Sequence, residues 1–278
     1  MITRGSRLRP APAGHMTNDT PVDGFEWVIQ PWGQVLRSSG LLAVADHFFT
    51  DRQLRLRGTS PEPGRWKLAA SAIGVEPGRL FRPKQVHGRS VAVVSRNCAP
   101  HPFSCGRRPE ADAVITNDPS CALAVQVADC VPILIGDPRT GAVAAVHAGW
   151  RGAAAGVVRA ALEALGAQYG SRPRDLVAAL GPSIGPCCYH VGPELADAFL
   201  AAGHAASSVE RWFERESDGR RRLDLWTATG DQLREAGVPT TGIHAVRLCT
   251  AHDTARFFSY RAEGPGTGRM AAVIKARG

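Results

Sequence analysis

The sequence has no continuous apolar stretch of the roughly 18 residues that a membrane-spanning helix needs. Residues 1–15 carry three arginines with no apolar segment behind them, so we expect no secretory signal. The seven cysteines are odd in number and show no C-x-x-C spacing, which argues against a disulfide framework and a zinc ribbon. We therefore predict a protein of the reducing cytoplasm that does not act at a membrane.

Lysine is nearly absent, since only Lys67, Lys84 and Lys275 contribute to the 33 basic residues. The net charge of +8 is dispersed, whereas a nucleic-acid protein usually gathers its charge on one face or tail. The compact clusters, Arg107–Arg108 and Arg220–Arg222, lie beside glycine or proline and are interpreted as solvated loops rather than polyanion-binding patches. No nucleic-acid partner is expected.

What the chain does have is enough apolar sequence for a sizeable core, with 44% hydrophobic and 21% charged residues. Residues 1–24 mix proline, glycine and polar residues, which predicts a disordered N-terminal extension. The sequence leaves open whether translation begins at Met1 or at Met16. No internal repeat or long linker interrupts the remainder, so residues 25–278 are predicted to form one catalytic domain.

The pattern becomes strand-like from Leu41 onward and is most regular in the middle of the chain. Strands are predicted at 122–127, 131–135, 142–146, 176–180, 245–248 and 271–275. Helices are predicted after residue 152, where apolar residues repeat at three- and four-residue spacing, and at 193–201 and 227–236. This mixture predicts an α/β or α+β class with a layered core.

Three residues suggest metal chemistry: His87, Cys130 and His147 each stand at the end of an apolar stretch, next to a glycine or a turn. Two imidazoles and a thiolate suit zinc, and three protein ligands leave a position open for water or substrate. Their spacing matches no local zinc-finger signature. A lone buried cysteine is also commonly a packing residue, so the residues alone leave this alternative open.

Cys130 and His147 also permit a rival chemistry, in which the thiol is a nucleophile and the imidazole its base. His87 separates the two hypotheses, because a thiol hydrolase does not need it. If residues 124–130 are extended, Asp129 points away from Cys130, which argues against Asp129 as an acid or base.

Arg151 follows a glycine between a predicted strand and helix, where a guanidinium and free backbone N–H groups would suit phosphate. A tight turn with a surface arginine is the alternative. Arg261, which follows several aromatic residues, is a second candidate anion ligand. Cys187 and Cys188 are interpreted as packing residues, because adjacent cysteines are poor metal partners for each other.

Six motifs occur in the order typical of a known family: Lys84–Gly88, Ala111–Thr116, Ala128–Pro132, Val146–Gly152, Leu180–Gly185, and Phe257–Arg261 with Thr267–Met270. From about Leu42 to Lys275 the chain resembles the laccase-domain family, also called the YfiH or multicopper polyphenol oxidase family. The resemblance implies a single α/β domain, with mixed sheets sandwiched by helices. It also implies a zinc held by His87, Cys130 and His147.

The same resemblance implies a purine nucleoside phosphorylase that splits adenosine, inosine and methylthioadenosine with phosphate, and that also deaminates adenosine. Gln85, Arg151 and Arg261 are then expected to bind substrate; oligomeric state stays open. Some bacterial members are linked to peptidoglycan editing, which a Cys–His thiol hydrolase or amidase would suit. A non-catalytic binding role is the remaining alternative.

Copper is possible at the same ligands, because copper outcompetes zinc in affinity. A multicopper oxidase, however, needs more ligands than nine histidines without a His-x-His pair supply. The chain departs from the family pattern at residues 47–58, where a glycine-rich stretch is usual. The N-terminal edge of the substrate pocket is therefore not defined by the resemblance.

Overall fold

The computed structural model describes residues 24–56, 63–95, 108–217 and 219–278. The predicted N-terminal extension, apart from Gly24, lies outside the described residues, as do Met1 and Met16. The boundary at residue 25 stays a prediction. Among the described residues, no helix combines the length and the apolar character needed to cross a membrane.

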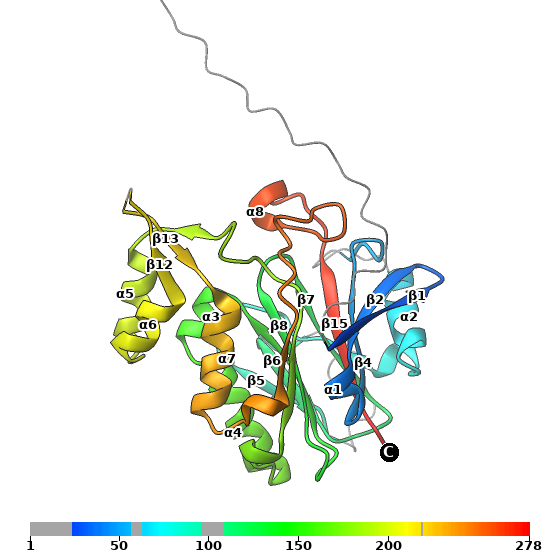
Figure 1. Cartoon of the computed structure of the whole chain (residues 1–278). Coiled ribbons are helices and arrows are strands. Elements are labelled where there is room, and N and C mark those ends of the chain that lie inside the picture. The colour runs from blue at the N-terminus through cyan, green and yellow to red at the C-terminus, as the bar shows by residue number, and fades with distance from the viewer. Residues whose placement is uncertain (1–23, 57–62, 96–107, 218) are drawn as a thin grey trace, which may run out of the picture.

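Two six-stranded mixed sheets form the centre of the molecule (Figure 1). The first sheet has the order β1-β2-β3-β15-β7-β4, with bounds Phe25–Gln30, Gly33–Ser38, Ala45–Thr50, Met270–Ala276, Ala122–Val127 and Leu80–Phe81. The second has the order β14-β10-β8-β9-β6-β5, with bounds Ile243–Ala245, Val177–Leu180, Val131–Gly136, Val143–Ala148, Ala113–Thr116 and Val91–Val93. Most neighbours are antiparallel, but β4 with β7, β5 with β6 and β10 with β14 are parallel. The prediction of mixed sheets is confirmed.

Strand β8 shows why the sheets stack, because it is buried on both faces. Leu134 packs into a core between the two sheets that also contains Leu123 of β7 and Ile274 of β15. Ile133 and Ile135 point the other way, into a core shared with the helices. Alternate side chains of a strand face opposite sides, so a continuous apolar run marks a strand covered on both faces.

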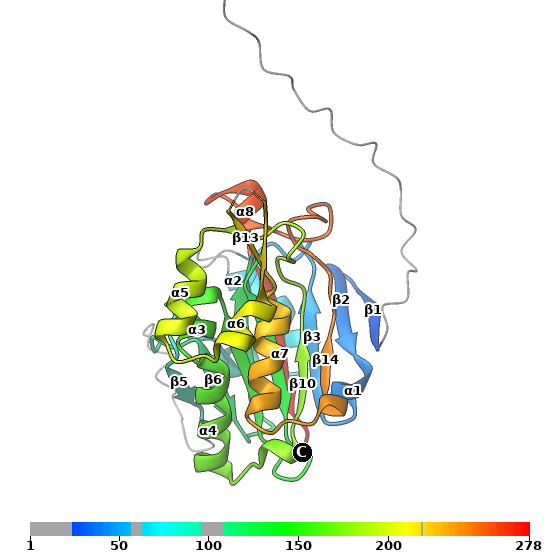
Figure 2. The ribbon, with the colours of Figure 1, turned by 60° about the vertical axis from the view of Figure 1, so that its left-hand side comes forward.

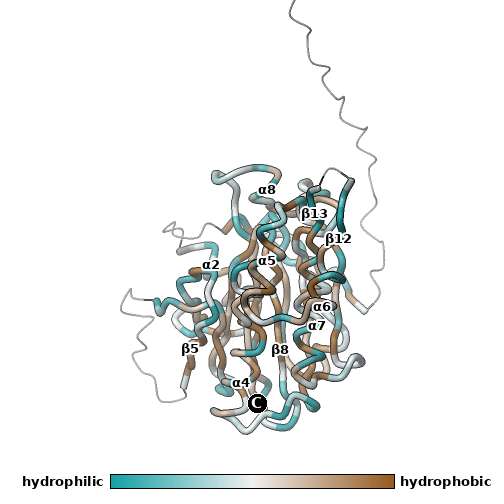
Figure 3. Tube along the Cα trace, turned by 90° about the vertical axis from the view of Figure 1, so that its left-hand side faces the viewer, coloured by the Kyte–Doolittle hydropathy of each residue, from teal (hydrophilic) through white to brown (hydrophobic). Residues whose placement is uncertain are grey.

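The helices cover the outer faces. On the second sheet lie α3 (Trp150–Ala154), α4 (Val157–Tyr169) and α7 (Leu225–Glu235), whereas α2 (Pro63–Ala72) covers the first sheet (Figure 2). The apolar residues of α4 that the sequence placed on one face are all buried. Figure 3 shows this as apolar chain inside and polar chain at the loops and rims.

A smaller unit flanks one end of the helical layer. It consists of α5 (Glu194–Ala201), α6 (Ala206–Trp212) and a three-stranded sheet of β11 (His190–Val191), β13 (Arg221–Leu223) and β12 (Phe213–Arg215). Two short helices, α1 (Ser39–Leu42) and α8 (Tyr260–Glu263), and three 3-10 turns at Pro77–Arg79, Pro173–Asp175 and Thr240–Gly242 complete the described elements.

Several expectations from the sequence are wrong in detail. The β1–β2 hairpin was not predicted, and Leu41, where strands were expected to begin, lies in α1. The strand expected at 245–248 is β14, which ends at Ala245 because its pairing with β10 ends there. Arg221 and Arg222 lie in β13 rather than in a loop, and Arg222 pairs with Glu214 at 2.7 Å.

The buried face of α4 generates a stability prediction. Leu165 is fully buried against the second sheet, so Leu165→Ala should lower the free energy of unfolding by about 2–5 kcal/mol through lost burial and a residual cavity. Leu200→Ala on α5 is a matched control, since Leu200 is 44% exposed, and should cost clearly less. Urea unfolding of both variants measures the difference. Equal losses would contradict this assignment of the core.

Candidate metal centre

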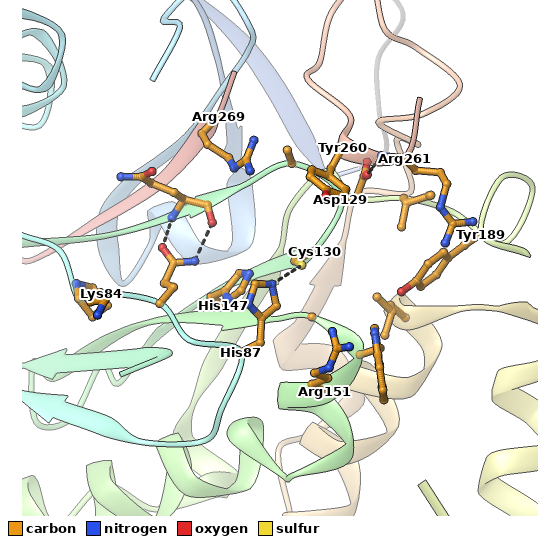
Figure 4. Close-up of a pocket in the computed structure, with 18 of the residues that line it drawn as sticks. Lys84, His87, Asp129, Cys130, His147, Arg151, Tyr189, Tyr260, Arg261 and Arg269 are labelled. Atoms are coloured by element: carbon orange, nitrogen blue, oxygen red, sulfur yellow. Dashed lines mark hydrogen bonds between the residues drawn. The ribbon is translucent and has the colours of Figure 1, made fainter. Parts of the chain in front are cut away.

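His87, Cys130 and His147 meet at one edge of the stacked sheets. Cys130 ends the turn between β7 and β8, and His147 is the penultimate residue of β9. Because Val131 pairs with Ala148 in the β8–β9 ladder, Cys130 and His147 are brought side by side. His87 reaches them from the loop before β5, and the three side chains point toward one another in Figure 4.

The geometry of the group is compact. The ligand atoms of the three residues lie within 4.8 Å of one another, and Cys130 Sγ is 3.9 Å from His87 Nε2. The two imidazole rings stand almost perpendicular, with centroids 4.8 Å apart. His147 is buried and Cys130 half-buried, whereas His87 is exposed to the cavity side.

One buried carboxylate holds the imidazole of His147 and the backbone of the loop that carries His87. Asp112 Oδ1 accepts hydrogen bonds from His147 Nδ1 at 2.8 Å and from the His87 backbone N–H at 3.0 Å. Asp112 Oδ2 accepts from the backbone N–H groups of Val86 and Gly88. These bonds hold His87 at a φ of 61°, a left-handed conformation that costs free energy in a residue with a side chain. The bond to Nδ1 leaves Nε2 of His147 to face Cys130.

Sequence reasoning missed this role of Asp112, although the motif Ala111–Thr116 contains it. The available signal was an acidic residue directly before the apolar run Ala113–Ile115, where burial demands hydrogen-bond partners. Its partners lie 24 to 35 residues away in the chain, so no local pattern identifies them.

The turn that carries Cys130 differs from what was expected. The chain leaves the extended conformation after Val127, and Asp129 has a φ of 92°. Asp129 therefore lines the same cavity as Cys130 instead of pointing to the opposite face. Its carboxylate accepts from Thr250 Oγ1 and from the backbone N–H of Arg261, both at 2.6 Å. With both oxygens engaged, Asp129 shapes the turn.

Glycine is required where the backbone passes closest to the group. A Cβ on Gly149 would come within 2.8 Å of Cys130 Sγ and 3.0 Å of the His87 ring. A Cβ on Gly152 would meet the backbone oxygen of Gly88 at 3.0 Å. The motif Val146–Gly152 thus lets β9 and α3 approach the loop of His87 closely.

The charges of the group shift two pKa values in opposite directions. Burial alone would raise the pKa of Cys130, but the charges and hydrogen bonds of His147 and His87 outweigh it and lower the pKa to about 6. Burial alone would lower the pKa of His147, but the Cys130 thiolate and Asp112 raise it to about 9. Without a metal, Cys130 and His147 therefore form a thiolate–imidazolium pair near neutral pH.

These donors fit a borderline-soft metal ion. A thiolate and two imidazoles match the ligand types of zinc, and a carboxylate on the second ring nitrogen of a ligating histidine is a common feature of zinc sites. The close approach at Gly149 keeps the space between the ligands clear of side chains. The group can therefore hold a metal ion, and the donors do not by themselves distinguish zinc from copper.

The centre opens into a cavity of about 620 Å³. Arg151 and Arg261 both line it, as the sequence suggested. The Arg151 guanidinium lies over the Trp150 ring at 4.4 Å, and that of Arg261 lies over Tyr189 at 5.0 Å. Sequence reasoning missed three further basic residues of the lining, namely Lys84, Arg108 and Arg269. The ring of Tyr260, one of the aromatic neighbours of Arg261, also lines the cavity. Arg108 lies in a loop, as the sequence suggested, but this part of the loop lines the cavity.

Gln85 also lines the cavity, but its amide is occupied. Nε2 donates to the backbone oxygen of Gln126 at 2.8 Å, and Oε1 accepts from the Gln126 N–H at 2.7 Å. These two bonds tie the loop of His87 to β7. The expectation that Gln85 binds substrate stays a prediction. Within the segment 47–58 that departs from the family pattern, residues 47–56 are described, and none of these lines the cavity.

The fold and this centre define a single-domain α/β protein with a His–Cys–His group at the base of a cationic cavity. Residues 64–277 match the family model described as multi-copper polyphenol oxidoreductase laccase. The chain belongs to this family.

Curated relatives carry a different activity in their names. The chain is 38% identical over 244 residues to a purine nucleoside phosphorylase of Streptomyces coelicolor, covering 82% of this chain and 94% of that protein. It is 38% identical over 163 residues to one of Bacteroides thetaiotaomicron, a match that spans 60% of that protein and 59% of this chain. The crystal structure of YlmD from Geobacillus stearothermophilus superimposes with a TM-score of 0.79 at 30% identity, covering 91% of this chain and 99% of that one.

The role of Asp112 can be tested through metal affinity. Asp112→Asn keeps the size of the side chain but replaces one carboxylate oxygen with an NH2 group. That group donates hydrogen bonds and cannot accept them from the backbone N–H groups of the His87 loop. Loss of an outer-shell partner of this kind should lower zinc affinity by roughly 10- to 100-fold. Competition with a chromophoric chelator measures the change. Asp118→Asn is the matched control, because Asp118 is also a buried carboxylate that accepts a backbone hydrogen bond, at 2.9 Å from Ser120, outside the centre.

The thiolate–imidazolium pair predicts a pH profile for alkylation of the metal-free protein. A lowered pKa means that the reactive thiolate is present above about pH 6, so the rate of iodoacetamide reaction at Cys130 should rise through that pH and then level off. Cys121, whose pKa burial raises, should react slowly throughout. Peptide mass spectrometry follows each site. A Cys130 midpoint close to the ordinary value of 9.0 would contradict the pairing.

Proposed function

We propose that this chain is a zinc-dependent, cytoplasmic purine nucleoside phosphorylase that also deaminates adenosine. Its substrates would be adenosine, inosine and methylthioadenosine together with phosphate. The products would be the free base and ribose 1-phosphate or its methylthio analogue. The observation that carries the proposal is the shared cavity, in which a His–Cys–His group faces guanidinium groups and aromatic rings. The names of the relatives agree with it.

The cationic wall suits phosphate. The five basic side chains of the lining face a single acidic one, Asp129, whose oxygens already accept two hydrogen bonds. Guanidinium groups bind phosphate through paired N–H donors. Arg151 stands nearest in sequence to His147, and Arg261 is held in place by donating to the backbone oxygen of His190 at 2.8 Å. We assign both to the phosphate.

The aromatic side chains suit a flat base and a sugar. Trp150, Tyr189 and Tyr260 all line the cavity, and stacking on such rings accepts any purine. Phosphorolysis would then join a phosphate oxygen to ribose C1′, break the bond from C1′ to the purine nitrogen, and return a proton to the base. Holding phosphate and nucleoside in one cavity makes this attack effectively intramolecular.

His87, Cys130 and His147 would hold the zinc. A zinc ion there supplies Lewis-acid polarisation of substrate groups and lowers the pKa of water. Asp112 fixes the tautomer of His147 and the loop of His87, so the ligand atoms are preorganised. The exposure of His87 on the cavity side leaves an approach for substrate.

Thiol chemistry is the second candidate, and one observation favours it. Cys130, His147 and Asp112 form the order of nucleophile, base and orienting carboxylate found in thiol hydrolases. A hydrolase or amidase of this type could act on peptidoglycan fragments. The copper polyphenol oxidase alternative lacks support from the site, since the described residues group only one pair of histidines with a thiol.

His87 distinguishes the two mechanisms. Under the zinc proposal, His87→Ala should lower adenosine phosphorolysis by at least about 100-fold, because losing a ligand exceeds the 10- to 100-fold effect of losing an outer-shell partner. His147→Ala should abolish phosphorolysis and deamination under either mechanism that uses it. His252→Ala is the control, because His252 is exposed and does not line the cavity.

The assay pairs metal analysis with product detection. The purified protein should contain about one zinc per chain at this centre, and it should form adenine and ribose 1-phosphate from adenosine and phosphate, and lose that activity on chelation. Two results would overturn the zinc assignment and favour the Cys130 nucleophile. One is full phosphorolysis in His87→Ala; the other is phosphorolysis that survives chelation but is lost on treatment with iodoacetamide.

A further inference from the structure

A second group of soft ligands lies outside the His–Cys–His centre. The sulfur atoms of Cys187, Cys188 and Cys249 all lie within 4.8 Å of one another, and those of Cys187 and Cys188 are 3.6 Å apart. Cys187 is exposed, and the other two are half-buried. The expectation that the adjacent pair packs in the core is therefore wrong for Cys187.

Cys249 changes the chemistry of the adjacent pair. Two neighbouring cysteines alone make a poor chelate, but a third thiol from a distant segment completes a triangle of sulfur atoms. With metal–sulfur bonds of about 2.3 Å, three thiolates around one ion lie about 4 Å from one another. The observed separations, 3.6 Å between Cys187 and Cys188 and at most 4.8 Å for the other pairs, are close to this value.

The backbone holds the two segments together. Ser183 bridges to Cys249, its N–H donates to Leu248, and the N–H of Thr250 donates to Ser183. The N–H of Gly185 donates to Cys249 Sγ at 3.2 Å, and the N–H of Cys188 donates to the oxygen of Gly185. An N–H donor to sulfur stabilises negative charge on that atom. These backbone bonds between residues 183–188 and 248–250 thus bring the three cysteines together in the fold.

We propose that Cys187, Cys188 and Cys249 form a second metal site, which binds a thiophilic d10 cation such as Cu(I) or Cd²⁺ through three thiolates. Thiolate sets without nitrogen or oxygen select soft ions. The site differs in this respect from the mixed imidazole–thiolate centre. It shares no residue with that centre, so it does not depend on the proposed phosphorylase activity.

A cysteine must lose its thiol proton to ligate a metal ion, so a cation that binds here replaces the thiol protons. The three cysteines serve as weak ligands for hard ions and as strong ligands for soft ones.

The position of the site links it to the cavity wall. Ile184 and Tyr189 flank the loop of Cys187 and Cys188, and both line the cavity. An ion on the three sulfur atoms would cross-link this loop to the segment of Cys249. Both segments also reach the Cys130 turn, since Ile184 N–H and Thr250 Oγ1 donate to Asp129.

The test is a Cd²⁺ titration of the fully reduced chain, followed by ultraviolet thiolate-to-cadmium absorbance and by competition with a chelator. Wild type should bind one ion at each group. Cys187→Ser and Cys249→Ser should each bind one tight ion fewer and lose more than half of the absorbance. Cys130→Ser should lose only about a quarter, because it removes one of the four thiolates in the two groups. Cys121→Ser, a free cysteine outside both groups, should match wild type.

Cys187 is the decisive position because it is exposed, so its serine variant should fold even if Cys249→Ser does not. The proposal would be overturned if Cys187→Ser bound as much Cd²⁺ as wild type and gave the same absorbance. It would also be overturned if Cys187→Ser lost a bound ion while a folded Cys249→Ser lost none. Thiol counting before each titration verifies that the cysteines are reduced. Because the readout is metal stoichiometry, the result does not depend on whether the chain phosphorolyses adenosine.

Discussion

The carboxylate of Asp112 is the constraint on which the geometry of the candidate metal centre depends. It lies buried between two segments that are far apart in sequence, and it satisfies three backbone N–H groups and one imidazole at once. A buried carboxylate without partners would be costly, so the loop of His87 and the end of β9 are held at the places where those partners are supplied. The left-handed conformation of His87 is retained for the same reason. One side chain therefore sets the positions of two ligands.

The register of the sheets supplies the remaining ligand. Strands β7, β8 and β9 are each buried along their whole length, so their registers are determined by packing on two faces. A slip of one residue in the β8–β9 ladder would turn His147 away from Cys130. Cys130 and His147 are thus positioned by strands that are buried along their whole length, whereas Arg151 and Arg261 reach the cavity from the short elements α3 and α8.

The sequence predicted the central strands, helix α4 and the three residues of the centre, because long apolar runs and motifs next to glycine are local signals. The β1–β2 hairpin escaped prediction because β1 shows no regular alternation of apolar and polar residues: Val28 and Ile29 are adjacent apolar residues, and Ile29 is exposed. The positions of Asp129, Arg108 and Cys249 were not predictable for another reason. Each depends on a partner segment or turn conformation that no spacing within its own segment encodes, as the bond from Gly185 to Cys249 across 64 residues shows.

The same three residues, Asp112, His147 and Cys130, can serve two chemistries, and the physical difference lies in what neutralises the thiolate. In a thiol hydrolase the imidazolium of His147 is the counter-charge and must be free to move its proton to substrate. In a metal centre the cation would be the counter-charge. His147 would then lose its Nε2 proton and keep the Nδ1 proton that it donates to Asp112, because a ligating imidazole is neutral. The first arrangement does not need His87, although His87 also lowers the pKa of Cys130. The His87 ring nevertheless lies against Cys130 and His147, and the residue is held in a left-handed conformation. Three backbone hydrogen bonds to Asp112 hold the loop that carries this imidazole, and an imidazole at this position is needed only where the group binds a metal ion.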